Sequence, residues 1–177
     1  MQRVKTSAPF VLVIDTSVLC VWMQVPGRES CGPSDDAWDH ARVEKEIQSS
    51  IKAGACLVLP LTTLIETGNH IAGATSKRFE LAKRLVELLN LAADGQSPWA
   101  AFGDQSELWK SENLKKLSDG WPSMAAKKLS LGDATIHEVA RYYSKMGREV
   151  RLLTGDQELA ALPVEKPSRI PRRRQAG

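Results

Sequence analysis

The 177-residue sequence has no long hydrophobic run. Its longest apolar stretches, such as residues 9–14, are far shorter than the roughly 20 residues that cross a membrane. The N-terminal residues lack the long apolar segment of a signal peptide. Hydrophobic residues make up 42% of the chain and charged residues 25%, as in ordinary globular proteins. We therefore expect one domain over residues 1–165, in the cytoplasm, without a membrane partner.

Cysteine is also scarce. Cys20, Cys31 and Cys56 are odd in number, and no Cys-x-x-Cys motif occurs. This spacing supports neither a structural zinc site nor a disulfide framework. We interpret the three side chains as small hydrophobic residues of the interior.

Several catalytic signatures are missing. The sequence contains no Gly-x-Ser-x-Gly, no P-loop, no Gly-x-Gly-x-x-Gly and no His-Glu-x-x-His. These absences argue against serine hydrolases, P-loop nucleotidases, dinucleotide-binding enzymes and zinc proteases.

The formal charge of +3 comes from one end of the chain. Residues 166–177 hold five of the 24 basic residues and no acidic residue, so 19 basic and 21 acidic residues remain, a charge of −2. The composition of this basic tail predicts disorder. It could contact phosphates without reading sequence, or be a solvated terminus with no role.

Short apolar strands alternate with helical patterns along the chain. Strands are predicted at 10–14, 55–59 and 150–153, with short strands at 98–102 and from 163. Helices are predicted at 34–53, 61–71, from Ser76 to Gly95, at 104–117 with a break at 120–122, and at 131–146. This alternation predicts an α/β fold, a three-layer α/β/α sandwich around a mainly parallel sheet. Trp99, Trp109 and Trp121 are interpreted as packing residues, with base stacking as the alternative.

Four acidic residues, each beside an apolar stretch, are the most informative feature. They are Asp15, Glu66, Asp133 and Asp156. Acidic side chains seldom lie in such surroundings unless they are paired or bind a cation.

The predicted fold brings these four residues to one edge of the sheet. Asp15 and Asp156 directly follow strands, and Glu66 lies early in the helix after a strand. Asp133 begins a helix that returns to start a parallel strand, so it begins where strands end. Ligands of open parallel sheets bind at this edge.

Each acid also has a purely structural explanation. Thr63 with Glu66, and Ser130 with Asp133, fit the capping-box pattern. Asp156 could cap a short helix at 157–161, and Asp15 could form a turn with the two residues after it. Capping does not require four acids at one edge, however, and like charges there repel unless a cation is present.

Oxygen ligands favour the hard cations Mg²⁺ and Mn²⁺. Such a site would hydrolyse phosphodiesters by activating water and stabilising the charge that develops on the phosphate. No nucleophilic side chain is required.

The chain resembles the PIN-domain nucleases, which include the VapC-type toxins of bacterial toxin–antitoxin pairs. The resemblance spans about residues 10–160 and rests on Val-Ile-Asp15-Thr-Ser-Val-Leu, Leu-Ile-Glu66, Gly-Asp133-Ala-Thr-Ile and Leu-Thr-Gly-Asp156. It implies a parallel sheet flanked by helices, an Mg²⁺- or Mn²⁺-dependent endoribonuclease, an RNA substrate and frequent homodimers. A toxin would also need an antitoxin partner.

The resemblance implies that Asp15, Glu66, Asp133 and Asp156 bind the metal. Thr154 would support them with its hydroxyl group, as would Thr16 or Ser17. Asn69 and His70 share a helix face with Glu66, and His137 is placed similarly after Asp133. These three side chains either assist the carboxylates or are polar residues at the rim of a cleft.

Three other functions fit part of the pattern. One is a catalytically inactive PIN-fold module that binds RNA or acts as a scaffold, and another is a PIN nuclease of RNA processing. The third is an aspartate phosphatase or receiver domain with Asp15 as nucleophile. Ser17 stands where the phosphatase pattern requires a second Asp.

Overall fold

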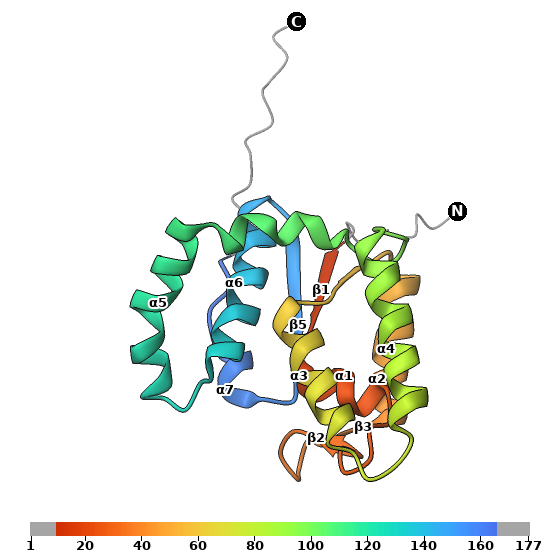
Figure 1. Cartoon of the computed structure of the whole chain (residues 1–177). Helices are drawn as coiled ribbons and strands as arrows, with labels where there is room; N and C mark the ends of the chain where they lie inside the picture. Colours follow the sequence, from red (N-terminus) through yellow and green to blue (C-terminus); the bar gives the residue numbers. More distant parts are fainter. Residues whose placement is uncertain (1–9, 166–177) are drawn as a thin grey trace, which may run out of the picture.

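The computed structural model describes residues 10–165, and the basic tail lies outside this range (Figure 1). In chain order, the helices and strands are β1 (Phe10–Ile14), α1 (Thr16–Trp22), β2 (Ser30–Cys31), β3 (Trp38–Asp39), α2 (His40–Lys52), β4 (Cys56–Val58), α3 (Leu61–Ala72), α4 (Arg78–Ala93), the 3₁₀-helix η1 (Phe102–Trp109), α5 (Ser111–Ala125), α6 (Leu131–Lys145), β5 (Glu149–Leu153) and α7 (Gln157–Ala160).

The central sheet has three parallel strands in the order β4-β1-β5. β1 is buried along its whole length, as expected of a continuous apolar strand between two neighbours. Helices flank the sheet, with α2 and α4 on one side in Figure 1 and α5 and α6 on the other. The predicted α/β architecture with a parallel sheet is therefore confirmed.

Side chains of β1 alternate between two hydrophobic cores. Phe10, Leu12 and Ile14 pack with residues of α1 to α4, whereas Val11 and Val13 pack with residues of α6 and α7. This alternation follows from the two-residue period of a strand. It fixes β1 at the centre of the molecule, with its carboxyl end directly at Asp15.

The region between β1 and α2 differs from the prediction. Residues 16–22 form a helix, and β2 and β3 form a small antiparallel hairpin. The helix predicted from Ser34 begins only at His40, where the Asp39 side chain accepts a hydrogen bond from the Arg42 amide at 2.8 Å. Gly32, with φ of +89°, lies between the two strands of the hairpin, in a backbone conformation that favours glycine.

Other boundaries were also wrong. α5 continues through the break predicted at Gly120 and Pro122. The Ser118 carbonyl, which Pro122 leaves without an amide donor, belongs to an exposed residue and can be hydrated. Ser76 does not cap α4, because Lys77 in the left-handed conformation precedes that helix without a side-chain cap.

The two short strands were not found as predicted. Residues 98–102 contribute only an isolated bridge between Trp99 and Leu57. Residues 163–165 are not a strand, and the rest of that prediction lies outside the described residues.

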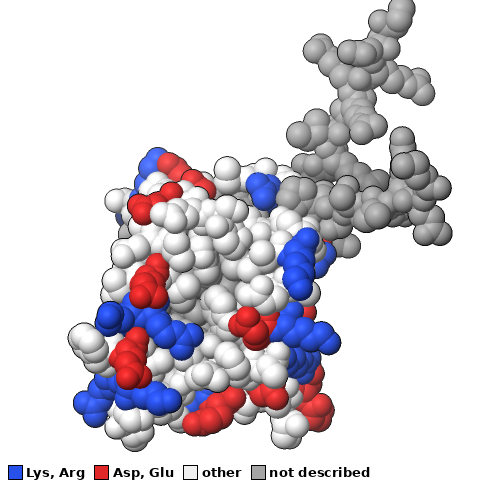
Figure 2. All heavy atoms as spheres, turned by 90° about the vertical axis from the view of Figure 1, so that its right-hand side faces the viewer, with Lys and Arg blue, Asp and Glu red and all other residues white. Residues whose placement is uncertain are grey.

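Helix α4 presents apolar side chains to solvent. Phe79 is 78% exposed and Val86 52% exposed. Figure 2 shows that the middle of this face carries no charged residue, while charges lie along both sides. Within residues 10–165, no helix has both the length and the apolar character that a membrane span needs.

Candidate metal centre

Asp15 is the most buried of the four candidate acids, with 4% of its surface exposed. It caps α1, and its Oδ1 accepts a hydrogen bond from the Thr16 amide at 2.6 Å. Its Oδ2 accepts hydrogen bonds from the hydroxyl groups of Ser17 at 2.6 Å and Thr154 at 2.8 Å. The two predicted supporting residues thus hold the carboxylate in one orientation.

Burial raises the pKa of Asp15, and the nearby Asp133 raises it further. Hydrogen bonds from Ser17, Thr154 and Thr16 act in the opposite direction but do not cancel the effect of burial. A nearby cation would stabilise the charged form of a carboxylate whose pKa burial has raised. Asp15 is therefore suited to bind a metal ion.

Glu66 lies one turn into α3 and reaches toward the end of β1. Its Oε2 accepts a hydrogen bond from the Thr16 hydroxyl at 2.7 Å. The predicted capping box with Thr63 is absent, because Thr63 donates instead to the Ile14 carbonyl at 3.0 Å, and α3 has no side-chain cap. The Glu66 carboxylate is thus oriented by Thr16, just after the end of β1, and not by a capping bond within α3.

Gly132 allows α6 to approach Glu66 closely. A side-chain carbon at this position would overlap Glu66 Oε1 and lie 3.1 Å from Thr62 Cγ2. A larger residue there would therefore require the Glu66 carboxylate to shift from the position that its bond to Thr16 gives it. Since Asp133 is the next residue, this contact also sets the distance between Glu66 and Asp133.

The structural explanations hold for Asp133 and Asp156. Ser130 and Asp133 form the predicted capping box of α6, with bonds of 2.7 and 3.0 Å. Asp156 caps α7 by accepting from the amides of Glu158 and Leu159 at 2.8 and 3.1 Å. Capping uses only part of each carboxylate, so both residues keep acceptor capacity for a ligand.

All four acids line one pocket of about 230 Å³ at the carboxyl edge of the sheet. They come from the end of β1, from α3, from the start of α6 and from the loop after β5. The structure therefore brings together residues that are 141 positions apart, from Asp15 to Asp156, as expected of parallel strands that end at one edge. Thr16 and Ser17 line the same pocket.

The donor set suits a hard cation, because all four acids offer oxygen. Within residues 10–165, no three His, Cys, Asp or Glu side chains are close enough together to coordinate one ion. The hydrogen bonds above orient each carboxylate toward an amide or hydroxyl group, and for Glu66 this group belongs to Thr16, 50 positions away.

Sequence reasoning missed the contribution of the hairpin segment. Arg28 and Cys31 line the pocket, and Arg28 Nη2 lies 3.2 Å from His70 Nδ1. The hairpin touches the loop after β5 so closely that a side-chain carbon at Gly155 would lie 2.7 Å from Cys31 Sγ. The only sequence signal was a basic residue in a loop rich in proline and glycine.

The remaining candidate residues divide into two groups. His70 lines the pocket, and partial burial together with the positive charge of Arg28 lowers its pKa. Asn69 is exposed and does not line the pocket. His137 lies elsewhere, with its Nε2 3.0 Å from the Pro163 carbonyl.

Comparisons of the chain with protein-family models, with curated proteins and with solved structures found no match. The case for a function therefore rests on the residues of this site.

Proposed function

We propose that this protein is an Mg²⁺- or Mn²⁺-dependent endoribonuclease of the PIN-domain kind. One observation carries the proposal: four carboxylates from four separate parts of the chain line one pocket at the carboxyl edge of a parallel sheet. Stability does not require such an arrangement, because like charges brought together cost free energy. The motifs around the four acids supply the family resemblance.

In this proposal, Asp15, Glu66, Asp133 and Asp156 would hold the metal. A bound divalent ion supplies an activated water molecule and neutralises charge on the phosphate. Hydrolysis would then require the water oxygen to bond to phosphorus while the bond to the leaving sugar oxygen breaks, with the proton of water passing to that leaving oxygen.

The protein's own residues would orient these groups. Ser17 and Thr154 fix Asp15 Oδ2, and the Thr16 hydroxyl fixes Glu66 Oε2. Arg28 supplies a positive charge at the rim of the pocket, where a substrate phosphate would enter. This division leaves the carboxylates to the metal and the arginine to the RNA.

We propose a toxin of a toxin–antitoxin pair as the biological role, with an antitoxin and a homodimer as its partners. Both partners follow from the resemblance and are tested separately. Co-expression with the product of a neighbouring gene tests the antitoxin, and light scattering of the purified chain tests the dimer. A PIN nuclease of RNA processing has the same chemistry but would not need an antitoxin for its expression to be tolerated.

The experiment that tests the activity is cleavage of a panel of single-stranded and structured RNAs with Mg²⁺, Mn²⁺ or EDTA. Asp15→Asn and Asp133→Asn should abolish metal-dependent cleavage. Asp119→Asn is the matched control, because Asp119 is an exposed acid on α5 outside the pocket. Equal cleavage by Asp15→Asn and the wild type would refute the proposal.

The attacking group can be tested on the substrate. Water as nucleophile predicts that a 2′-deoxy nucleotide at the cleaved position is still cut, without a cyclic phosphate product. A requirement for the 2′-hydroxyl group would contradict a metal-activated water.

A second candidate is an inactive PIN-fold module that binds RNA. The observation that favours it is the spacing of the acids, of which no three within the described range can share one ion. This candidate predicts RNA binding with no cleavage in Mn²⁺ and no effect of Mn²⁺ on thermal stability.

A further inference from the structure

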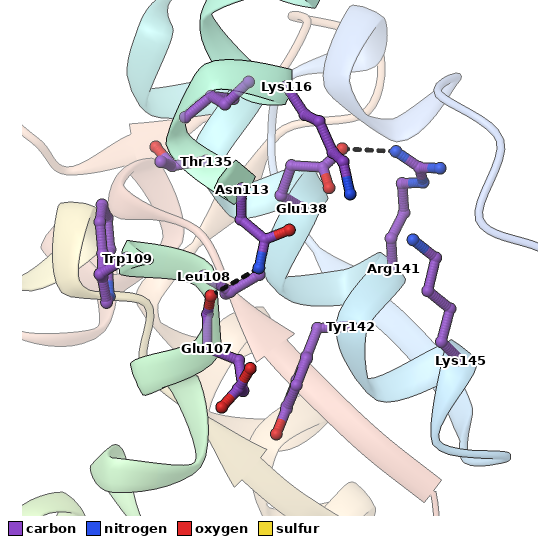
Figure 3. Close-up of a pocket in the computed structure, with 11 residues that line it drawn as sticks. Glu107, Leu108, Trp109, Asn113, Lys116, Thr135, Glu138, Arg141, Tyr142 and Lys145 are labelled. Atoms are coloured by element: carbon purple, nitrogen blue, oxygen red, sulfur yellow. Dashed lines mark hydrogen bonds and ion pairs between the residues drawn. The ribbon is translucent and has the colours of Figure 1, made fainter. Parts of the chain in front are cut away.

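A second pocket, of about 360 Å³, lies between η1, α5 and α6 (Figure 3). We call it the α5–α6 pocket. Its chemistry differs from that of the carboxylate pocket, because its lining includes three basic and two aromatic side chains. These are Lys116, Arg141, Lys145, Trp109 and Tyr142.

The α5–α6 pocket carries uncompensated positive charge. Glu138 pairs with Arg141 at 2.6 Å, and Glu107 pairs with Lys110 at 2.5 Å. Among residues 10–165, no carboxylate forms an ion pair with Lys116 or Lys145. Two exposed ammonium groups are therefore available to anions, and they come from different helices that face one pocket.

Aromatic side chains lie in the same pocket. In Figure 3, Trp109 lies on one side of the view, while Lys116, Arg141 and Lys145 reach in from the other. Tyr142 lies below, with its ring on edge against Tyr143 at 5.2 Å. Trp109 Nε1 is buried and has no hydrogen-bond partner in the described part of the chain, so the partly exposed ring is the part of Trp109 that a ligand can contact.

Residues of helix α6 line both pockets. Thr135 lines it and lies two residues after Asp133. The Thr135 hydroxyl is 2.9 Å from that of Thr62, which lies one turn before Glu66 on α3. From Asp133 to Lys145, α6 extends about 18 Å, a length that several nucleotides of a single strand would cover.

Phosphates and bases together define the ligand class. Ammonium groups beside aromatic rings are the combination that binds single-stranded nucleic acid. A duplex keeps its bases stacked inside, so they could not reach Trp109, and an A-form helix is too wide for this pocket. A phosphate-only ligand would use the ammonium groups but not the exposed part of the Trp109 ring.

We propose that the α5–α6 pocket binds the single-stranded RNA segment next to the bond that is cut. Lys116 and Lys145 contact phosphates, and Trp109 stacks on a base. The assignment rests on the proposed nuclease function, for which it names the residues that hold the RNA beside the cleaved bond.

The test compares two double variants of the full chain. Lys116→Ala with Lys145→Ala removes the two lysines of the pocket, and Lys52→Ala with Lys115→Ala removes two exposed lysines that do not line it. All four lysines are exposed, so both variants should fold, which circular dichroism checks. The basic tail is present in both proteins and contributes equally.

Binding is measured by fluorescence anisotropy with a labelled single-stranded RNA in EDTA, where cleavage is suppressed. We expect the pocket variant to bind at least about tenfold more weakly, with the slope of log K against log salt reduced by about 1.4. Trp109→Phe, which keeps a ring, should weaken binding less. Equal binding by the two double variants, or equal competition by duplex RNA or free mononucleotide, would overturn the proposal.

A cleavage assay separates this inference from the proposed function. If the wild type cuts RNA and the pocket variant cuts it with a raised KM and an unchanged kcat, both stand. If the wild type cuts and the pocket variant has an unchanged KM, only the α5–α6 assignment fails. If the wild type cuts no RNA in any metal, the nuclease proposal fails, and the inference that rests on it fails too.

Discussion

The two pockets of this protein share helix α6 but are built in opposite ways. The carboxylate pocket collects acids that are spread over residues 15–156 of the chain, and the topology of the sheet brings them together. The α5–α6 pocket is formed by one continuous stretch, residues 107–145, through the packing of neighbouring helices. The proposed metal site therefore depends on the whole fold, whereas the proposed RNA contact depends on a local unit.

The pockets also differ in burial. Asp15 is 4% exposed and has a raised pKa, so its charge destabilises the fold. Lys116 and Lys145 are exposed and cost the fold little. Substitutions in the first pocket should therefore alter both activity and stability, and substitutions in the second should alter binding alone.

The largest expected effect comes from comparing two acids on α6, one in each pocket. Asp133→Asn should lower kcat by about 100-fold or more, since loss of even an outer partner of a metal ligand costs up to about 100-fold. Glu138→Gln should lower KM instead, because it removes a negative charge from the α5–α6 pocket, where we propose that RNA binds. Steady-state cleavage kinetics measure both constants.

Both substitutions keep the local structure. The side-chain oxygen of an asparagine in place of Asp133 could still accept a hydrogen bond from the Ser130 amide, and Glu138 is partly exposed. A lower kcat in Glu138→Gln together with normal turnover in Asp133→Asn would reverse the assignment of the two pockets.

Gly132→Ala tests how tightly the carboxylate pocket is built. The added methyl group would overlap Glu66 Oε1, so α6 or Glu66 must move. We expect a loss of about 1–3 kcal/mol in unfolding free energy, together with reduced cleavage. Urea denaturation and the cleavage assay measure the two effects.

Gly120→Ala is the matched control, because nothing lies within 4 Å of a methyl group at that position on α5. It should stabilise the protein by roughly 0.5–1 kcal/mol, the usual gain in a helix. If Gly132→Ala were equally harmless, the close contact between α6 and Glu66 would not matter for the site.

The sequence predicted the carboxylate pocket because its determinants are local patterns joined by a simple topological rule. A continuous apolar strand before Asp15, and the capping pattern of Ser130 and Asp133, can both be recognised without coordinates. The rule that parallel strands end at one edge then placed the acids together.

The α5–α6 pocket and the hairpin could not be predicted in this way. The path of the hairpin depends on its contact with Gly155, more than 120 residues later in the chain. Pro122 and Gly120 suggested a break, yet α5 continues and supplies Lys116 to the pocket. The helix-breaking tendency of these two residues is outweighed there by the packing of α5 against α6.

Asp15→Asn tests whether the buried charge of Asp15 lowers the stability of the fold. The folded pKa of Asp15 is raised, so the folded state binds its proton more tightly than the unfolded chain. The penalty is absent below the unfolded pKa near 4 and grows as pH rises through the folded pKa. At pH 7 without metal, Asp15→Asn should therefore melt a few degrees above the wild type, and the difference should vanish toward pH 3.

A divalent metal ion should reduce or reverse this difference in melting temperature between Asp15→Asn and the wild type. Mn²⁺ should raise the melting temperature of the wild type with increasing concentration, and should not affect Asp15→Asn. Differential scanning fluorimetry across pH, with and without Mn²⁺, measures both effects. Asp119→Asn should follow the wild type in every condition, and a parallel Mn²⁺ response in Asp15→Asn would remove Asp15 from the metal site.

The smallest expected effect concerns Arg28, the one Lys or Arg side chain that lines the carboxylate pocket in the described range. It lies near His70 and is exposed, so its removal should not disturb the fold. If it contacts a substrate phosphate, Arg28→Ala should weaken RNA binding a few-fold and reduce the slope of log K against log salt by about 0.7.

Two variants are the controls for Arg28→Ala. Arg28→Lys should retain most of the slope, because the charge remains, and Arg148→Ala changes an exposed arginine outside both pockets. An unchanged salt slope in Arg28→Ala would show that Arg28 makes no contact with a phosphate. The triple variant, which adds Lys116→Ala and Lys145→Ala, tests whether one strand crosses both pockets along α6. Additive losses of binding free energy in that variant would support such a strand.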